Sequence, residues 1–126
     1  MTTTFHKVAV VDDDPRVRKL IGLSLGELGV DADFYDEPFE FLRVVSDSSP
    51  KLVLIDLMMP QMDGVECCRR LRQLGCTAYL CIVSALYDDQ MVRDALSAGA
   101  NRYLGKSEVF EILDELLKAS DCFSAS

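Results

Sequence analysis

The chain has 126 residues, of which 49% are hydrophobic, and this size and composition fit one compact domain with its own core. Its 21 acidic residues against 13 basic ones give a formal net charge of −8. Such a surface repels a nucleic-acid backbone and an anionic membrane. We therefore expect no nucleic-acid binding by this domain alone and no membrane partner.

The cysteines and the N-terminus bear on the cellular compartment. The 5 cysteines are odd in number and show no CxxC spacing, which predicts reduced thiols rather than disulfides or a zinc site. The first residues lack the apolar core of a signal peptide, and no apolar run approaches the roughly 20 residues of a membrane span. We expect a soluble, cytoplasmic protein. Its single histidine, His6, lies near the N-terminus, and we expect it to have no catalytic role.

The first predicted elements are a strand and a helix. Val8 to Val11 is an apolar run that predicts a strand. Asp14, followed by Pro15, predicts an N-cap and the start of a helix. We expect Asp14 to cap this helix and not to bind a metal ion. Apolar residues then recur at three- and four-residue spacings until Gly29, where the helix should end.

Strands and helices continue to alternate along the chain. The remaining predictions are a weaker strand at 32–35, a short helix from about 37 with Asp36 as its N-cap, a buried strand at 52–55, a helix from 64 to about 74, the longest apolar run at 78–83, a helix at 89–98, a short strand at 102–104 and a last helix at about 107–119. This alternation predicts an α/β domain, a doubly wound parallel sheet with helices on both faces. Residues 1–119 are expected to form it, and residues 120–126 a tail or the start of a linker to an output domain.

Ionisable and hydroxyl side chains follow the predicted strands. They are Asp12 and Asp13, Asp56, Ser84 and Lys106. Parallel strands present their carboxyl ends at one edge of the sheet, so these side chains should meet there. Three carboxylates repel one another unless a cation joins them, and their oxygens suit Mg²⁺. Asp56 is the natural nucleophile toward phosphorus, because it stands alone after the central strand, while Lys106 and Ser84 could contact phosphoryl oxygens.

Four segments together resemble the receiver domain of two-component response regulators. They are Val10-Val11-Asp12-Asp13-Asp14-Pro15, Ile55-Asp56-Leu57-Met58-Met59-Pro60-Gln61-Met62-Asp63-Gly64, Ile82-Val83-Ser84-Ala85 and Tyr103-Leu104-Gly105-Lys106. The resemblance covers roughly residues 7 to 119. It implies a five-stranded, flavodoxin-like (βα)5 fold in three layers with strand order 2-1-3-4-5. It also implies transfer of a phosphoryl group from a histidine kinase or phosphotransfer protein onto Asp56.

The resemblance further implies a role for each matching residue. The expected Mg²⁺ ligands are Asp12, Asp13, Asp56 and the backbone carbonyl of Met58. Ser84 is expected to move toward the aspartyl phosphate, and Tyr103 to turn inward behind it. The family's readout is a repacked face formed by the fourth helix, fifth strand and fifth helix. That face would contact an effector protein, a fused output domain or a second copy in a homodimer.

Two departures from the family pattern carry expectations of their own. Ser107 stands where the family has a proline after a cis peptide, and a cis bond without proline costs about 3 to 4 kcal/mol. A trans peptide with a shifted loop and a strained cis peptide both remain open, and Ser107 is expected to cap the last helix. Met58 and Leu86 are apolar and cannot orient an attacking water, which predicts slow loss of the phosphoryl group.

Other interpretations remain for the chain and for single residues. An Mg²⁺-dependent phosphohydrolase also uses an aspartate nucleophile, but it needs a second aspartate where this chain has Met58, and room for a cap. A degenerate receiver that never accepts phosphate is the other alternative. The leading expectation is a signalling module and not an enzyme, limited to accepting and slowly losing a phosphoryl group. Asp63 is expected to shape its turn, and Tyr103 could instead be a strand aromatic with its hydroxyl in water.

Overall fold

A computed structural model describes residues 4–122 of the chain. In chain order its elements are β1 (Val8–Val11), α1 (Pro15–Glu27), β2 (Ala32–Tyr35), α2 (Pro38–Ser48), β3 (Leu52–Asp56), α3 (Gly64–Gln73), β4 (Tyr79–Ser84), α4 (Asp89–Ser97), β5 (Arg102–Gly105) and α5 (Glu108–Ala119). These are the five strands and five helices that the sequence predicts. No described helix has both the length and the apolar character needed to cross a membrane.

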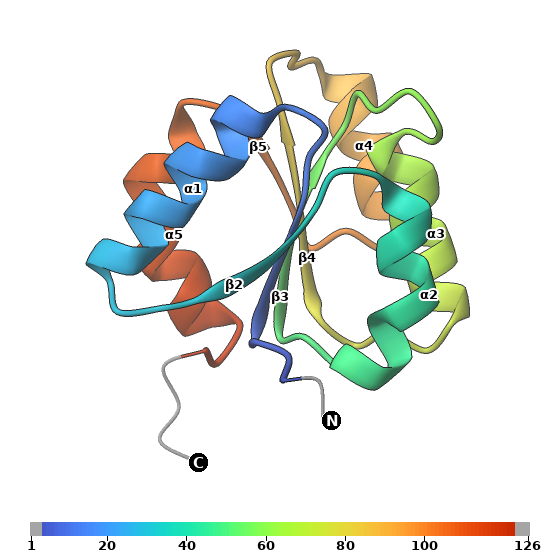
Figure 1. The fold of residues 1–126 in the computed structure, drawn as a ribbon. Helices are drawn as coiled ribbons and strands as arrows, with labels where there is room; N and C mark the ends of the chain where they lie inside the picture. The colour runs from blue at the N-terminus through green and yellow to red at the C-terminus, as the bar shows by residue number, and fades with distance from the viewer. Residues whose placement is uncertain (1–3, 123–126) are drawn as a thin grey trace.

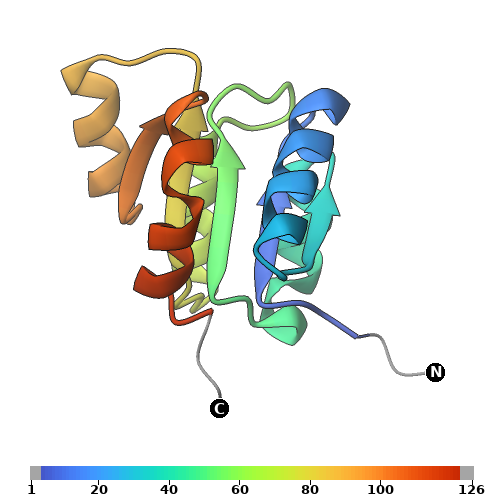
Figure 2. The same ribbon diagram turned by 90° about the vertical axis from the view of Figure 1, so that its left-hand side faces the viewer.

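The strands form one parallel sheet in the order β2-β1-β3-β4-β5, which confirms the predicted topology. Figure 1 shows α1 and α5 on one face of this sheet and α2, α3 and α4 on the other, and Figure 2 shows the same three layers after a quarter turn. The chain reverses its direction of progress across the sheet between β1 and β3. Open parallel sheets place their functional side chains outside the carboxyl ends of strands at such a point.

Successive side chains of the central strands point to opposite faces of the sheet, and so contribute to a hydrophobic core on each face. Ala9 and Val11 of β1 pack toward the face that α2, α3 and α4 cover, together with Phe41 of α2. Val8 and Val10 pack toward the opposite face, where α1 and α5 provide the covering side chains. All four residues of β1 and all five of β3 are buried, which is why these strands read as continuous apolar runs.

Most predicted helix boundaries are confirmed, and one cap is corrected. The Asp14 carboxylate accepts from the N–H of Arg16 and caps α1, and Gly29 follows that helix with a φ of 75°. The predicted Asp36 cap of α2 is wrong: Glu37 occupies the position, and its carboxylate accepts from two N–H groups of the first turn. Glu37 directly precedes Pro38, the first residue of the helix, and its extended backbone places its carboxylate beside the free N–H groups.

The expected side-chain cap of α5 by Ser107 is wrong. Ser107 occupies the N-cap position, but its backbone is already helical and its hydroxyl makes no capping hydrogen bond. Instead, the carboxylate of Glu108 accepts from the N–H of Gly105 at 3.0 Å. Ser120 and Cys122 are buried beyond the end of α5, and Cys122 N–H donates to the Leu117 carbonyl at 2.8 Å. The rest of the predicted tail, residues 123–126, lies outside the described residues, as do residues 1–3.

Candidate functional site

Three carboxylates meet at the carboxyl edge of the sheet. Asp12 and Asp13 directly follow β1, and Asp56 is the last residue of the adjacent strand β3. One oxygen from each of the three lies within 4.8 Å of the others. Asp12 and Asp56 are buried, at 2% and 4% exposure, whereas Asp13 is exposed. The predicted cluster therefore exists, with one side open to solvent.

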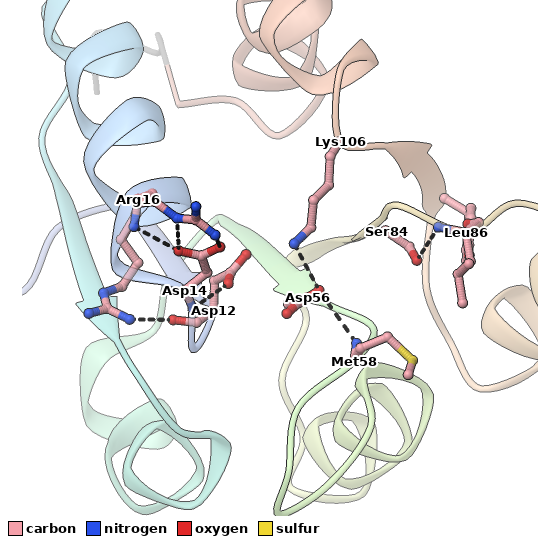
Figure 3. A network of polar contacts seen from close by, with 10 residues as sticks. Asp12, Asp14, Arg16, Asp56, Met58, Ser84, Leu86 and Lys106 are labelled. Carbon is pink, nitrogen blue, oxygen red and sulfur yellow. Dashed lines mark hydrogen bonds and ion pairs between the residues drawn. The ribbon is translucent and has the colours of Figure 1, made fainter.

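The loop after β1 is held by two arginines of α1. Asp12 Oδ1 accepts from the N–H of Asp14 at 2.9 Å, and Arg18 Nη1 donates to the Asp12 carbonyl at 2.7 Å. Arg16 forms an ion pair with Asp14, so it does not compete for the cluster (Figure 3). This role of Arg18 was not predicted from the sequence. A signal was present, because basic residues early in a helix oppose its dipole and so need an acidic or carbonyl partner nearby.

Close backbone contacts fix the loop after Asp56. Gly64 N–H donates to the Leu57 carbonyl at 2.8 Å, and a Cβ at Gly64 would lie 2.7 Å from the Asp56 carbonyl oxygen. No side chain fits there without moving the backbone that carries the carboxylate. Asp63 caps α3 through the N–H of Glu66, in keeping with its expected turn role. Met58 N–H lies 3.4 Å from Asp56 Oδ1, which places Met58 beside the carboxylate.

Lys106 reaches the cluster from the end of β5. Its Nζ lies 3.7 Å from Asp56 Oδ1 (Figure 3). Its backbone N–H donates to the Ser84 carbonyl at 2.9 Å. No peptide bond among residues 4–122 is cis, so the bond between Lys106 and Ser107 is trans. A trans peptide with serine therefore still delivers the amine to the carboxylate.

Ser84 and Tyr103 both form hydrogen bonds with the backbone of the loop that follows β4. Ser84 is the last residue of β4, and its Oγ accepts from the Leu86 N–H at 3.0 Å (Figure 3). Tyr103 is 7% exposed and its hydroxyl donates to the Leu86 carbonyl at 2.5 Å, with Tyr87 packed edge-on at 5.5 Å between centroids. The alternative in which the Tyr103 hydroxyl lies in water is wrong. One residue, Leu86, thus contacts both predicted switch residues.

The electrostatics of the cluster favour a bound cation. Burial first, and then the negative charge of Asp12, raises the pKa of Asp56 to about 7, against the opposing effect of Lys106. Burial likewise raises the pKa of Asp12. Oxygen-only donors from three carboxylates are the ligands that Mg²⁺ prefers, and a divalent cation would offset the repulsion that raises these pKa values. The residues present therefore fit a magnesium ion.

Removing one carboxylate charge should stabilise the protein without metal. A carboxyl whose pKa is raised on folding favours folding fully below its unfolded value of 3.8, and this contribution is lost as the pH rises through about 7. We therefore expect Asp56→Asn, in a chelator, to be more stable than wild type at about pH 8, by on the order of 2 kcal/mol. The difference should shrink at about pH 5, and urea unfolding measures it.

Magnesium supplies the internal control for that experiment. Adding Mg²⁺ at about pH 8 should stabilise wild type, because an ion that binds only the folded state shifts unfolding by mass action. The same addition should have much less effect on Asp56→Asn. A variant less stable than wild type at the higher pH in chelator would contradict the unfavourable charge cluster.

Comparisons with known proteins agree with this fold and these motifs. Residues 8–118 match the family described as response regulator receiver domain. Response regulator MprA from Mycobacterium sp. (strain KMS) is 33% identical over 113 residues, covering 90% of this chain and 49% of that protein. The chain therefore spans about half the length of the curated relatives it matches.

Solved receiver domains superpose closely on the structure. The signal receiver domain of NarL from Mycobacterium tuberculosis has a TM-score of 0.83 and 25% identity, covering 94% of this chain and 98% of that one. The BeF3-activated receiver domain of RstA from Klebsiella pneumoniae has a TM-score of 0.78 and 29% identity, covering 88% and 97%. The family match, the relative and the shared fold together establish that this chain belongs to the response regulator receiver family.

Proposed function

We propose that Asp56 accepts a phosphoryl group from a histidine kinase or a phosphotransfer protein in a two-component phosphorelay. The observation that carries this proposal is the convergence of the Asp12 and Asp13 carboxylates and the Lys106 amine on the buried carboxylate of Asp56, with Lys106 Nζ 3.7 Å from Asp56 Oδ1. Placing a buried carboxylate beside two others lowers the stability of the folded protein, because like charges repel and burial removes their hydration. A reaction that uses these charges would account for their placement together.

The transfer step follows from the chemistry of the named groups. An Asp56 oxygen forms a bond to phosphorus while the phosphorus–nitrogen bond of the donor's phosphohistidine breaks, and the bonding pair stays on the imidazole. Bound Mg²⁺ would neutralise phosphoryl oxygens and would be held by Asp12, Asp13, Asp56 and the backbone carbonyl of Met58. Lys106 would contact a phosphoryl oxygen, and the Ser84 hydroxyl would donate a hydrogen bond to another.

The readout would pass through Leu86 to the face formed by α4, β5 and α5. Moving Ser84 toward a phosphoryl oxygen would release the Leu86 N–H, and the Leu86 carbonyl is also the partner of Tyr103. A movement of the Leu86 backbone would therefore affect Ser84 at the end of β4 and Tyr103 in β5. We propose that this face contacts an effector protein, an output domain joined after residue 119 or a second copy, and that the protein acts in the cytoplasm.

Intact-mass analysis tests the phosphoacceptor directly. The protein is incubated with acetyl phosphate and Mg²⁺, beside an Asp56→Asn variant and a sample containing chelator. One added phosphoryl group in wild type, absent from both controls, is the expected result. Phosphorylation of the Asp56→Asn variant would show that another residue is the acceptor. A wild-type protein that gains no mass would be a degenerate receiver.

The apolar rim of the site predicts slow phosphoryl loss. Met58 is 61% exposed and Leu86 46% exposed, so each could contact an incoming water without offering it a hydrogen bond. We expect Met58→Gln to shorten the aspartyl-phosphate lifetime roughly tenfold, the effect of about 1.4 kcal/mol in the barrier. The decay of the phosphorylated mass after removal of acetyl phosphate measures this lifetime.

A matched change on another surface controls for general effects of adding an amide. Leu23 of α1 is 58% exposed and lies outside the loops of the site, so Leu23→Gln should keep the wild-type lifetime. A wild-type lifetime of seconds, unchanged by Met58→Gln or Leu86→Gln, would show that neither side chain limits access of water.

A further inference from the structure

The surface between α2 and α3 contains a groove whose lining contrasts with the acidic chain. The groove encloses about 360 Å³ and is lined by Phe39, Leu42, Arg43, Arg70, Gln73 and Leu74. Two arginines and no carboxylate line it, although the whole chain has a net charge of −8. We call these six residues the α2–α3 groove.

Large apolar side chains form the floor of the groove. Phe39 is 37% exposed and Leu74 is 51% exposed, while Leu42 is partly buried against the core beneath α2 and α3. Phenylalanine and arginine are both enriched at the centres of protein interfaces, and both are present on this surface. The exposed apolar area beside them would contribute to the affinity of a docked partner.

The two arginines are oriented by acidic neighbours outside the lining. Arg70 Nε donates to Glu66 at 3.0 Å, and its guanidinium carbon lies 5.7 Å from the centroid of the Phe39 ring. Arg43 Nη2 lies 3.7 Å from Glu37 Oε1, in an exposed pair that contributes little binding energy. Glu37 and Glu66 reduce the net positive charge, so the arginines should select among ligands more than they drive binding.

We propose that the α2–α3 groove docks an amphipathic, acidic segment of a partner protein. Its leucine-sized side chains would cover Phe39, Leu42 and Leu74, and its carboxylates would face Arg43 and Arg70. A groove between two helices suits a helical segment, and positive segments would be rejected by the same two arginines.

Docking there would leave the face formed by α4, β5 and α5 free. Figure 1 shows α2 and α3 side by side on the face of the sheet opposite α1 and α5, and no groove residue belongs to α4, β5 or α5. The segment could therefore stay bound while that other face contacts a different partner. The proposal stands independently of the phosphoacceptor chemistry, and its test uses no phosphodonor.

Two synthetic peptides provide the probe. One is an amphipathic helix of about 16 residues with leucines on one face and glutamates on its flanks, and its twin has lysine at each glutamate position. Calorimetry gives the affinities, and backbone amide NMR shifts locate the site. We expect the acidic peptide to bind roughly tenfold more tightly or better than its twin, with shifts centred on residues 39–43 and 70–74. Equal affinities, no binding, or shifts centred elsewhere would overturn the proposal.

Charge reversal tests the arginines against a matched control. Arg43→Glu with Arg70→Glu should invert the preference, so that the lysine peptide binds more tightly. Arg93→Glu removes another exposed arginine, which lies on α4 and donates a hydrogen bond to Gln90, and this change should alter neither affinity. Circular dichroism verifies that each variant is folded, and an unchanged preference in the folded double variant would overturn the proposal.

A second copy of this chain is the alternative occupant. Sedimentation velocity over a concentration series measures self-association of wild type and of the double variant. A monomer in both cases is expected. Self-association that disappears when Arg43 and Arg70 are reversed would assign the groove to a second copy and refute the separate partner.

Discussion

Replacing Lys106 with methionine is expected to slow phosphorylation of Asp56 by roughly 10²- to 10³-fold, the usual cost of removing one preorganised contact to a developing charge. The substitution keeps the length of the side chain but removes the only cation within 4 Å of the Asp56 carboxylate among residues 4–122. The backbone N–H of Lys106 still donates to Ser84, so the end of β5 should stay in place. The initial rate of mass gain with acetyl phosphate and saturating Mg²⁺ measures the loss.

Two variants separate the role of the amine from other effects of the Lys106→Met change. Lys118→Met removes an exposed lysine in the last turn of α5, far from the carboxyl edge, and should leave the rate at the wild-type value. Lys106→Arg keeps the charge but places a planar fork where a compact ammonium stood, so we expect an intermediate rate. A Lys106→Met protein that is phosphorylated at the wild-type rate would remove Lys106 from the chemistry.

The sequence predicts the architecture well because β1, β3 and β4 carry strong local signals. Each is a nearly unbroken apolar run with a polar residue at its carboxyl end, and a parallel sheet converts that order into spatial proximity. Asp12, Asp13, Asp56 and Lys106 could therefore be placed at one edge without coordinates. Their roles in phosphoryl transfer remain predictions.

Details that depend on side-chain reach were not predictable in this way. Glu37 instead of Asp36 caps α2, because two adjacent acids look alike in sequence and only the backbone geometry decides which one reaches the free N–H groups. Leu86 contacts Ser84 and Tyr103 through its backbone N–H and carbonyl groups. The residue type at position 86 therefore does not indicate these contacts. The role of Arg72 was also missed, because its partners are carbonyls spread along the chain.

Arg72 should be the most important arginine for stability. From α3 it donates to the carbonyls of Cys76, Ala78 and Gly99 at 2.8 to 3.0 Å and to the side chain of Asn101 at 3.0 Å. These acceptors lie at the amino-terminal ends of β4 and β5, on the edge of the sheet opposite Asp56. We expect Arg72→Leu to lower the free energy of unfolding by about 3 kcal/mol, because it leaves several inward-facing carbonyls without their donor.

Arg72 packs closely against the loop at Gly99, and its several donors distinguish it from lysine. Gly99 has a φ of 109°, and a Cβ there would lie 2.6 Å from Arg72 Cγ, so the loop and the arginine stem pack against each other. An ammonium is one point of charge and cannot span four acceptors, so Arg72→Lys should recover only a small part of the loss. Arg69 forms an exposed ion pair with Glu66, which is its only ion pair among the described residues, so Arg69→Leu should change stability by less than about 0.5 kcal/mol. Urea unfolding of the three variants compares them, and similar small losses in all three would mean that water replaces the guanidinium at these carbonyls without cost.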